Sequence, residues 1–292
     1  MEPIFEIKGL KKSFKDFSLK GIDISLNRGY IMGFIGPNGA GKTTTIRLMM
    51  NLLRKDDGEI KIFGKDYIQF EKEIKNKLGF VYDENHFYEE LTIEEMKWVI
   101  APFYEKWNES LYKSYMKDFN LPLKKKIKDL SRGMKMKFSL AIALSHDAEL
   151  LVMDEPTSGL DPVIRSELLE ILSQTIQDEN KAVFFSTHIT SDLDKIADYI
   201  TLIDDGKILL DGEKDELLDS YGLVRGNKEI LNADINKDFI NVRENQFGFE
   251  ALVKDKNHIK KIYGDKIIIE KPNIEDIMLY YTGRWQNAKS NN

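Results

Sequence analysis

The segment GPNGAGKTT, residues 36–44, has the glycine and lysine spacing of a phosphate-binding loop. It directly follows the apolar run YIMGFI, which is typical of a buried strand. Its glycines allow successive backbone N–H groups to point at phosphate oxygens, and a helix expected to begin near Lys42 adds its positive N-terminal end. The candidate phosphate-binding residues are Gly36, Asn38, Gly39, Ala40, Gly41, Lys42, Thr43 and Thr44.

Three side chains of this segment have distinct expected roles. Lys42 is placed to reach the β- and γ-phosphates of a nucleoside triphosphate, and Thr44 to donate to a phosphate. Thr43 is the expected ligand of a magnesium ion through its hydroxyl. A glycine-rich turn in front of a structural helix is the alternative, and the complete motif directly after a strand disfavours it.

A second chemical signal is LLVMDEPTSGLDP, in which an apolar strand ends in Asp154 and Glu155. An aspartate at the carboxyl end of a buried strand, beside a phosphate loop, is placed to hold magnesium, usually through water. The next carboxylate, Glu155, can orient or deprotonate the attacking water. Acids at strand ends are often solvated turn residues, so the neighbouring phosphate loop is what favours the catalytic interpretation.

A second anion-binding helix start is predicted in DLSRGMKMKFSLAIALS, which begins at Asp129. Ser131 is a candidate N-cap, and Gly133 leaves the backbone open beside it. An ordinary capped helix is the alternative. One phosphate loop already serves one nucleotide, so a second such site makes sense if it closes over a nucleotide held by another subunit.

With these motifs in this order, the chain closely resembles the ATP-binding subunits of ABC transporters over roughly residues 4–220. The family signature LSGGQ is matched by LSRGM, with Arg132 and Met134 as departures. The resemblance implies that Asp161 in SGLDP couples the two sites of a dimer and that His188 in FFSTH contacts the γ-phosphate. It also places Phe14 where an aromatic ring stacks on adenine, although Phe14 could equally be a core ring.

Asp83 departs from the family pattern, which usually has glutamine after the strand that corresponds to LGFVY. The resemblance places this side chain near magnesium and the attacking water, so Asp83 is a candidate catalytic and metal-binding residue. Aspartate is shorter than glutamine and charged, so its reach and its pKa will differ. Subunits of some bacterial drug and peptide exporters are similar in having an acid here and a small C-terminal domain, which favours export.

Aromatic residues are concentrated after Asp83 and in the following helical segment. In the family, this region forms a groove for a short cytoplasmic helix of the membrane subunit, and aromatic rings supply large, stiff contact area. The alternative for Trp98 and Phe103 is that they pack the core of the helical segment itself. The candidate partner contacts are Phe87, Tyr88, Trp98, Phe103, Tyr104 and Trp107.

The elements that position these residues follow an α/β pattern. Short β-branched or aromatic runs occur at IFEIKG, IDISL, YIMGFIG, EIKIFG, LGFVY, ELLVMD, AVFFST and YITLID, separated by helical patterns. We expect a phosphate-loop NTPase core of the ABC ATPase type in residues 1–220, with an antiparallel β subdomain. A helical insertion is expected at about 84–145, with a helix after the Thr92 and Glu95 capping box and another near Ser110.

Residues 221–292 change character and predict a small α+β accessory domain. Three short runs, FINV, GFEALV and KIIIE, are typical of strands, and Asn273 precedes a helical pattern, NIEDIMLYY.

Composition limits the possible partners. The net charge of -6 argues against broad attraction to nucleic acid or anionic lipid, and no nucleic-acid partner is expected. Cysteine is absent, which fits a reducing compartment. The longest apolar runs are far shorter than the roughly 20 residues that span a bilayer, so if the protein works at a membrane, another chain holds it there. The family resemblance implies that this other chain is an integral membrane subunit and that the location is the cytoplasmic face of the cell membrane.

We therefore expect an ATPase that dimerises head to tail around two MgATP molecules, as a homodimer or a pseudo-symmetric heterodimer, and drives a separate membrane protein that exports a peptide, drug or lipid-like substrate. The alternative is a soluble ABC ATPase acting in translation or DNA maintenance. The single cassette, and the spacing from Lys42 to Ser131, which leaves no room for a long coiled coil, count against it. A nucleotide-dependent binding module without useful hydrolysis is a third possibility, and Glu155 counts against it.

Overall fold

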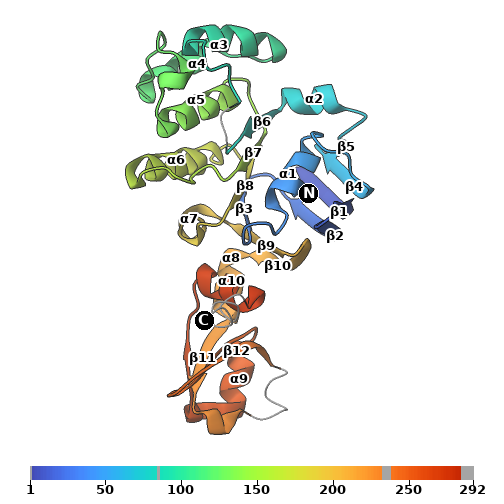
Figure 1. Cartoon of the computed structure of the whole chain (residues 1–292), viewed down its shortest axis with the longest axis vertical. Helices are drawn as coiled ribbons and strands as arrows, with labels where there is room; N and C mark the ends of the chain where they lie inside the picture. Colours follow the sequence, from blue (N-terminus) through green and yellow to red (C-terminus); the bar gives the residue numbers. More distant parts are fainter. Residues whose placement is uncertain (1, 84–85, 232–237, 284–292) are drawn as a thin grey trace.

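The computed structural model describes residues 2–83, 86–231 and 238–283. In Figure 1, the sheets and helices up to about residue 220 form one body, and a third sheet with its own helices extends from it. Among the described residues, every helix is too short or too polar to cross a lipid bilayer.

The first sheet is antiparallel and has the strand order β2-β1-β4-β5. Buried residues alternate with more exposed ones along much of β1 and β2, so one face of the sheet covers the core. Its strands are β1 (Phe5–Ser13), β2 (Ser18–Leu26), β4 (Asp57–Ile62) and β5 (Lys65–Asp66).

The second sheet has the order β10-β9-β3-β8-β7-β6, in which β10 is antiparallel to β9 and the remaining pairs are parallel. Strands β3, β7 and β8 are buried along their whole length, as expected for a parallel sheet covered on both faces. Its strands are β3 (Ile31–Ile35), β6 (Leu78–Val81), β7 (Leu150–Asp154), β8 (Ala182–Thr187), β9 (Tyr199–Asp204) and β10 (Lys207–Glu213).

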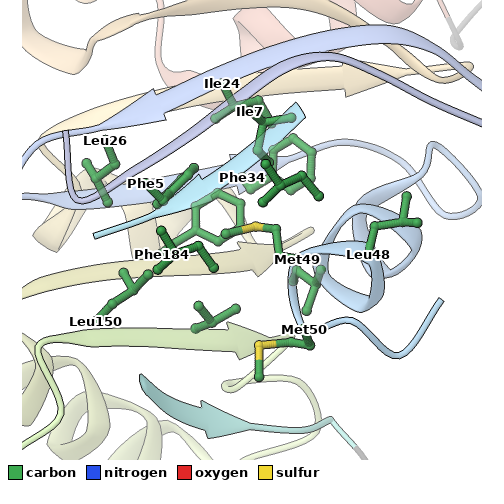
Figure 2. Packing of buried hydrophobic residues seen from close by; sticks show 14 of the residues in the cluster. Phe5, Ile7, Ile24, Leu26, Phe34, Leu48, Met49, Met50, Leu150 and Phe184 are labelled. Atoms are coloured by element: carbon green, nitrogen blue, oxygen red, sulfur yellow. The ribbon is translucent and has the colours of Figure 1, made fainter. Parts of the chain in front are cut away.

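The two sheets and α1 (Lys42–Met49) enclose the largest core of the body, part of which is shown in Figure 2. The Phe184 ring of β8 lies 5.1 Å from Phe5 and 5.4 Å from Phe34, measured between ring centroids. All three rings are fully buried. This packing fixes the carboxyl ends of β3, β7 and β8 relative to the start of α1.

Helices cover the second sheet and form the insertion between β6 and β7. The predicted capping box is confirmed, because Thr92 accepts from Glu95 N and the Glu95 carboxylate accepts from Thr92 N. The predicted second helix is also present and begins at Glu109, with Asn108 as its cap. The helices are α2 (Glu71–Asn76), α3 (Ile93–Ile100), α4 (Glu109–Asp118), α5 (Arg132–Leu144), α6 (Pro162–Thr175), α7 (Thr190–Ile196) and α8 (Lys214–Ser220).

The third sheet has the order β12-β13-β11-β14, and its neighbours are antiparallel. Asn273 caps the last helix, as predicted from the sequence. Ile274 of that helix packs into the core of the second sheet, so the C-terminal elements contact the main body. The elements are β11 (Gly222–Gly226), β12 (Phe239–Asn245), β13 (Gly248–Val253), α9 (Lys256–Tyr263), β14 (Ile267–Glu270) and α10 (Ile274–Thr282).

Candidate nucleotide-binding site

The phosphate loop lies between the end of β3 and the start of α1. Gly41 immediately precedes this helix with φ 119°, in a region that favours glycine. A Cβ at Gly41 would approach Phe17 to 2.9 Å, and one at Gly36 would approach the Ile203 carbonyl to 2.2 Å. These two positions therefore require glycine, because a larger residue would push the loop out of its place above the sheet.

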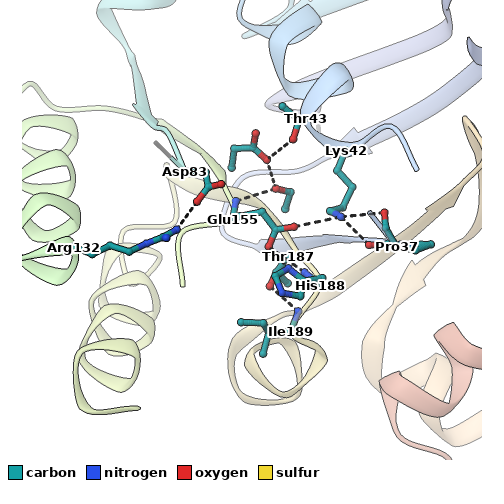
Figure 3. A network of polar contacts seen from close by, with 12 residues as sticks. Pro37, Lys42, Thr43, Asp83, Arg132, Glu155, Thr187, His188 and Ile189 are labelled. Atoms are coloured by element: carbon teal, nitrogen blue, oxygen red, sulfur yellow. Dashed lines mark hydrogen bonds and ion pairs between the residues drawn. The ribbon is translucent and has the colours of Figure 1, made fainter. Parts of the chain in front are cut away.

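Lys42 is 6% exposed, and its ammonium is directed back over this loop. It donates to the Gly36 carbonyl at 2.8 Å and lies 3.3 Å from Glu155 Oε1 (Figure 3). A buried ammonium costs free energy unless oxygen atoms surround it. Here both contacts are to oxygen atoms, which stabilise the buried charge and hold it at the loop. The ammonium is therefore suited to bind an anionic oxygen that enters the loop.

Asp154 is held at the end of β7 by two hydroxyl groups from different elements. Thr43 Oγ1 donates to Asp154 Oδ1 at 3.2 Å, and Ser186 Oγ of β8 donates to the same oxygen at 2.6 Å. The Ser186 hydroxyl also accepts from Glu155 N at 3.0 Å. The Thr43 hydroxyl and the Asp154 carboxylate thus bring together two oxygen ligands of the kind that magnesium prefers.

Glu155 has a left-handed backbone, with φ 49°, which is uncommon for a residue other than glycine. Its carboxylate lies beside the loop that follows β8. Oε2 accepts from His188 N at 3.2 Å and is 2.7 Å from His188 Nδ1, while Oε1 faces Lys42 (Figure 3). The strained turn therefore brings Glu155 between the Lys42 ammonium and the His188 imidazole.

A cavity of about 510 Å³ opens at this point. It includes most of the residues that the sequence assigned to the phosphate site, but Gly36 and Ala40 are outside its lining. Phe17 and Ser158 line it, although their sequence context did not single them out. The lining residues are Phe17, Asn38, Gly39, Gly41, Lys42, Thr43, Thr44, Asp83, Glu155, Ser158 and His188.

Phe14, the residue predicted to stack on adenine, lies next to this cavity and does not line it. Its ring is 45% exposed and stacks on Phe17 with 6.4 Å between the centroids. The exposure excludes a fully buried core position. Stacking on a base remains a prediction for Phe14, and Phe17 is a second aromatic ring at the same end of the cavity.

Three residues predicted to act across the dimer are outside the cavity: Ser131 and Gly133, expected to serve the other subunit's nucleotide, and Asp161, expected to couple the two sites. Ser131 caps α5 by accepting from Met134 N at 3.2 Å, and Asp161 caps α6 by accepting from Val163 N at 3.0 Å. Both capping residues are exposed. Gly133 lies where a Cβ would approach Ile164 of α6 to 3.1 Å. The starts of α5 and α6 are therefore packed together, with both capping residues accessible from solvent.

Comparisons with known proteins identify the family of this chain. The family model described as "ABC transporter" matches residues 19–158, and a model of an AAA domain matches residues 126–194. The bacitracin transport ATP-binding protein BcrA of Bacillus licheniformis is 34% identical over 212 residues, which are 72% of this chain and 69% of the relative. This chain belongs to the ABC transporter ATP-binding family.

Two further comparisons agree with this assignment. The lantibiotic transport ATP-binding protein SrtF of Streptococcus pyogenes is 32% identical, over 73% of this chain and 92% of the relative. A solved ATP-binding subunit of an ABC transporter superposes with a TM-score of 0.67 and 27% identity, over 73% of this chain and 91% of that one. The predicted ABC-type ATPase fold is confirmed.

The family assignment also identifies the activity. The chain is an ATP-hydrolysing subunit of an ABC transporter, as predicted from its motifs. A soluble ATPase of translation or DNA maintenance is not favoured, because the relatives described above are transport proteins.

Asp83 of this ABC ATPase forms an ion pair that its sequence motifs did not predict. Its Oδ1 accepts from Arg132 Nη2 at 2.7 Å, across 49 positions of the chain (Figure 3). Arg132 is the residue that replaces a glycine of the family signature. The two departures from the family pattern therefore contact each other.

A second, apolar groove of about 560 Å³ lies between α3, α5 and the strand β6. Phe87 and Tyr104 line it, and both also have core contacts: Phe87 is 4.8 Å from Phe138, and Tyr104 stacks on the buried His146 at 3.7 Å, between ring centroids. Phe103 lines the groove and is 74% exposed. The groove thus has a fixed aromatic base with an exposed ring at its edge.

The six predicted aromatic contacts fall into two groups. Packing of Trp98 and Phe103 in the core of the insertion, the alternative considered above, is wrong, because these rings are 65% and 74% exposed. Tyr88 is also 66% exposed. By contrast, Trp107 packs on the core of the insertion and donates from Nε1 to Glu109 at 3.1 Å.

Proposed function

We propose that this ABC ATPase binds MgATP in the 510 Å³ cavity and drives the export of a peptide or peptide-like antibiotic through a separate membrane subunit. The observation that carries the nucleotide site is the convergence of Lys42, Asp154 and Glu155 beside one phosphate loop. The transport names of BcrA and SrtF, together with an acid at position 83, support a peptide-like substrate.

The residues present fit a magnesium nucleotide. Backbone N–H groups of the loop and the Lys42 ammonium bind the phosphates, while Thr43 and Asp154 supply the magnesium ligands. The described residues include no group of three or more acidic, histidine or cysteine side chains that could hold a metal by themselves. Magnesium needs only a few protein ligands when phosphate oxygens and water molecules complete its coordination shell. Magnesium held there would neutralise charge that develops on the phosphates.

Glu155 is the proposed general base. Its carboxylate would accept a proton from the attacking water, and the two contacts from His188 hold Oε2 beside the loop after β8, while Oε1 faces Lys42. His188 is the proposed contact to the γ-phosphate, and Asp83 the proposed partner of a magnesium-bound water. Phe14 stacks on the adenine in this proposal.

The complete site needs a second ATPase subunit. Ser131, Gly133 and Asp161 lie at accessible helix starts outside the chain's own cavity, where a head-to-tail partner can reach them. The N-terminus of α5 would then direct its positive end toward the partner's nucleotide. The partner is either a second copy of this chain or a related subunit.

The membrane subunit is proposed to dock in the apolar groove, where Phe87 forms part of the base and the exposed Phe103 an accessible edge. Tyr88 and Trp98 lie exposed in the adjoining segments and would extend this contact. Docking would hold the ATPase at the cytoplasmic face of the membrane. Residues 221–292 form an accessory domain in this proposal.

A substitution at Glu155 tests the catalytic assignment. Glu155→Gln should retain ATP binding and lower the ATPase turnover by about 100-fold, as expected for loss of a general base. Turnover and nucleotide affinity would be measured on the purified chain, with Glu170→Gln on the exposed side of α6 as a matched control. Turnover close to that of the unsubstituted chain would exclude Glu155 as the base.

A further inference from the structure

Arg132 connects three segments around the nucleotide cavity. It is the first residue of α5, and its guanidinium donates to Asp83, which follows β6. The same guanidinium lies against the loop after β7, since a Cβ at Gly159 would be 3.0 Å from Arg132 Nη1. Gly159 has φ +66°, so this close approach occurs where the backbone itself favours glycine. The Arg132 side chain is therefore placed by contacts on two sides.

The charges around the cavity explain how the Arg132–Asp83 ion pair can affect nucleotide binding. Among the charged residues of its lining, Lys42 is a cation, whereas Asp83 and Glu155 are carboxylates. Asp154 adds a third carboxylate under Thr43. A polyphosphate brings several negative charges into this cavity, so a carboxylate in its lining opposes binding unless a cation neutralises it.

Arg132 does not line the cavity, and its guanidinium contacts Asp83 from the start of α5. The family's usual pair at these two positions, glutamine and glycine, carries no charge. In this chain an aspartate and an arginine replace them together, and the two side chains form an ion pair. The substitution of one position therefore supplies the counter-charge for the other.

We propose that Arg132 is a positioning residue that neutralises and orients Asp83 so that a nucleoside triphosphate can bind beside this carboxylate. The proposal rests on the nucleotide site proposed above. Asp83 has a second positive partner once magnesium accompanies the nucleotide. The contribution of Arg132 is therefore largest for nucleotide without magnesium and smaller for the magnesium complex.

The experiment measures the affinity of the full chain for a fluorescent ATP analogue, with EDTA and with Mg²⁺. Arg132→Gln should weaken binding by about fivefold in EDTA, where solvent screening of an exposed charge keeps the effect modest. In Mg²⁺ the same change should weaken binding by less than about twofold. In a chain that already carries Asp83→Asn, the same Arg132→Gln change should have almost no effect. Arg132→Lys should restore most of the affinity, because it returns the positive charge.

Lys135→Gln is the matched control. Lys135 lies one turn further along α5 and pairs with Glu89 at 3.6 Å, so this change removes the same charge from the same helix without touching Asp83. It should change the affinity by less than about twofold. Asp83 and Arg132 are 41% and 50% exposed, so the fold should survive each substitution, and circular dichroism would verify this.

The outcomes separate this proposal from the nucleotide site on which it rests. Equal weakening by Arg132→Gln with Asp83 and with Asn at position 83 would overturn the positioning role, because Arg132 would then act on the nucleotide directly. Equal weakening by Lys135→Gln would overturn it as well. If the unsubstituted chain fails to bind the analogue, or if Lys42→Ala leaves its affinity unchanged, the site itself is wrong.

Discussion

Ser186 offers a sharp test of how the two acids are positioned. This fully buried hydroxyl donates to Asp154 at 2.6 Å and accepts from Glu155 N at 3.0 Å. Ser186→Ala removes both contacts. Glu155 N keeps the Ser186 carbonyl at 3.1 Å, so the main loss is the hydrogen bond to the Asp154 carboxylate. A hydrogen bond to a charged group contributes about 1.5–3 kcal/mol, and we expect Ser186→Ala to lower the free energy of unfolding by about 2 kcal/mol.

Activity should fall by more than stability alone explains. Among the described residues, Asp154 then keeps the longer contact from Thr43, at 3.2 Å, so its carboxylate gains freedom at the proposed magnesium site. We expect the ATPase turnover to fall about tenfold under conditions in which the variant is still folded, because small displacements of reacting groups are costly.

Urea unfolding and steady-state ATPase assays measure the two effects. The urea midpoint should fall while the slope stays constant, which would identify a change in stability alone. Ser145→Ala is the control, since Ser145 is equally buried and, within the described part of the chain, its hydroxyl donates to the Ala141 carbonyl of its own helix, at 2.6 Å. Ser145→Ala should lower the free energy of unfolding by about 1 kcal/mol and leave the ATPase turnover unchanged. If Ser186→Ala resembled Ser145→Ala in both assays, the positioning of the acids by Ser186 would be refuted.

Three further predictions address the dimer, the docking groove and pH. Chains with Ser131→Arg, mixed with chains with Lys42→Ala, should regain part of the ATPase activity as verified heterodimers; strictly additive loss would contradict a shared site. The double change Tyr88→Ala and Phe103→Ala should leave the urea midpoint nearly unchanged and weaken binding to the membrane subunit, by about 2 kcal/mol if either ring is a hot spot. Co-purification of the membrane subunit measures this binding, and normal co-purification would exclude these rings as docking contacts. Burial lowers the pKa of His146 in the folded chain, so the unfolded chain binds the extra proton, and stability should fall as pH drops through about 6.5. An equal fall in a His146→Gln chain would assign this pH dependence to other groups.

The fold and the phosphate site were predictable because their signals are local. Gly36–Thr44 and Asp154 each stand next to an apolar strand within a few residues, and the capping boxes at Thr92 and Asn273 span only four positions. Three strands were missed because they lack such a local signal. Strand β5 consists of only two residues, Lys65–Asp66. Strand β10 is only half-buried on the edge of its sheet, and β11, GLVRG, has glycine at both ends, so neither shows a clear apolar run.

Contacts between distant segments could not be predicted in this way. Ser186 is one hydroxyl at the end of the run AVFFST, and its partner Asp154 lies 32 positions earlier on the neighbouring strand. Only the parallel pairing of β7 with β8, which places Asp154 opposite Ser186, makes this serine part of the site. Phe17 was missed similarly, since it reaches the cavity through its packing against the Gly41 turn.

Asp83 and Arg132 show how far two separate departures from a family pattern can be interpreted together. The first is an acid where the family usually places a neutral amide near magnesium and the attacking water, and the second is a bulky cation at a helix start that usually carries glycine. The two charges pair at 2.7 Å, so the acid has a counter-ion and the cation has a fixed place. Opposite charges at two departing motif positions are visible in the sequence itself, and they would select Arg132 as a candidate partner of Asp83. Replacing Asp83 by glutamine and Arg132 by glycine together should then retain nucleotide binding, whereas replacing Arg132 alone should not retain it fully.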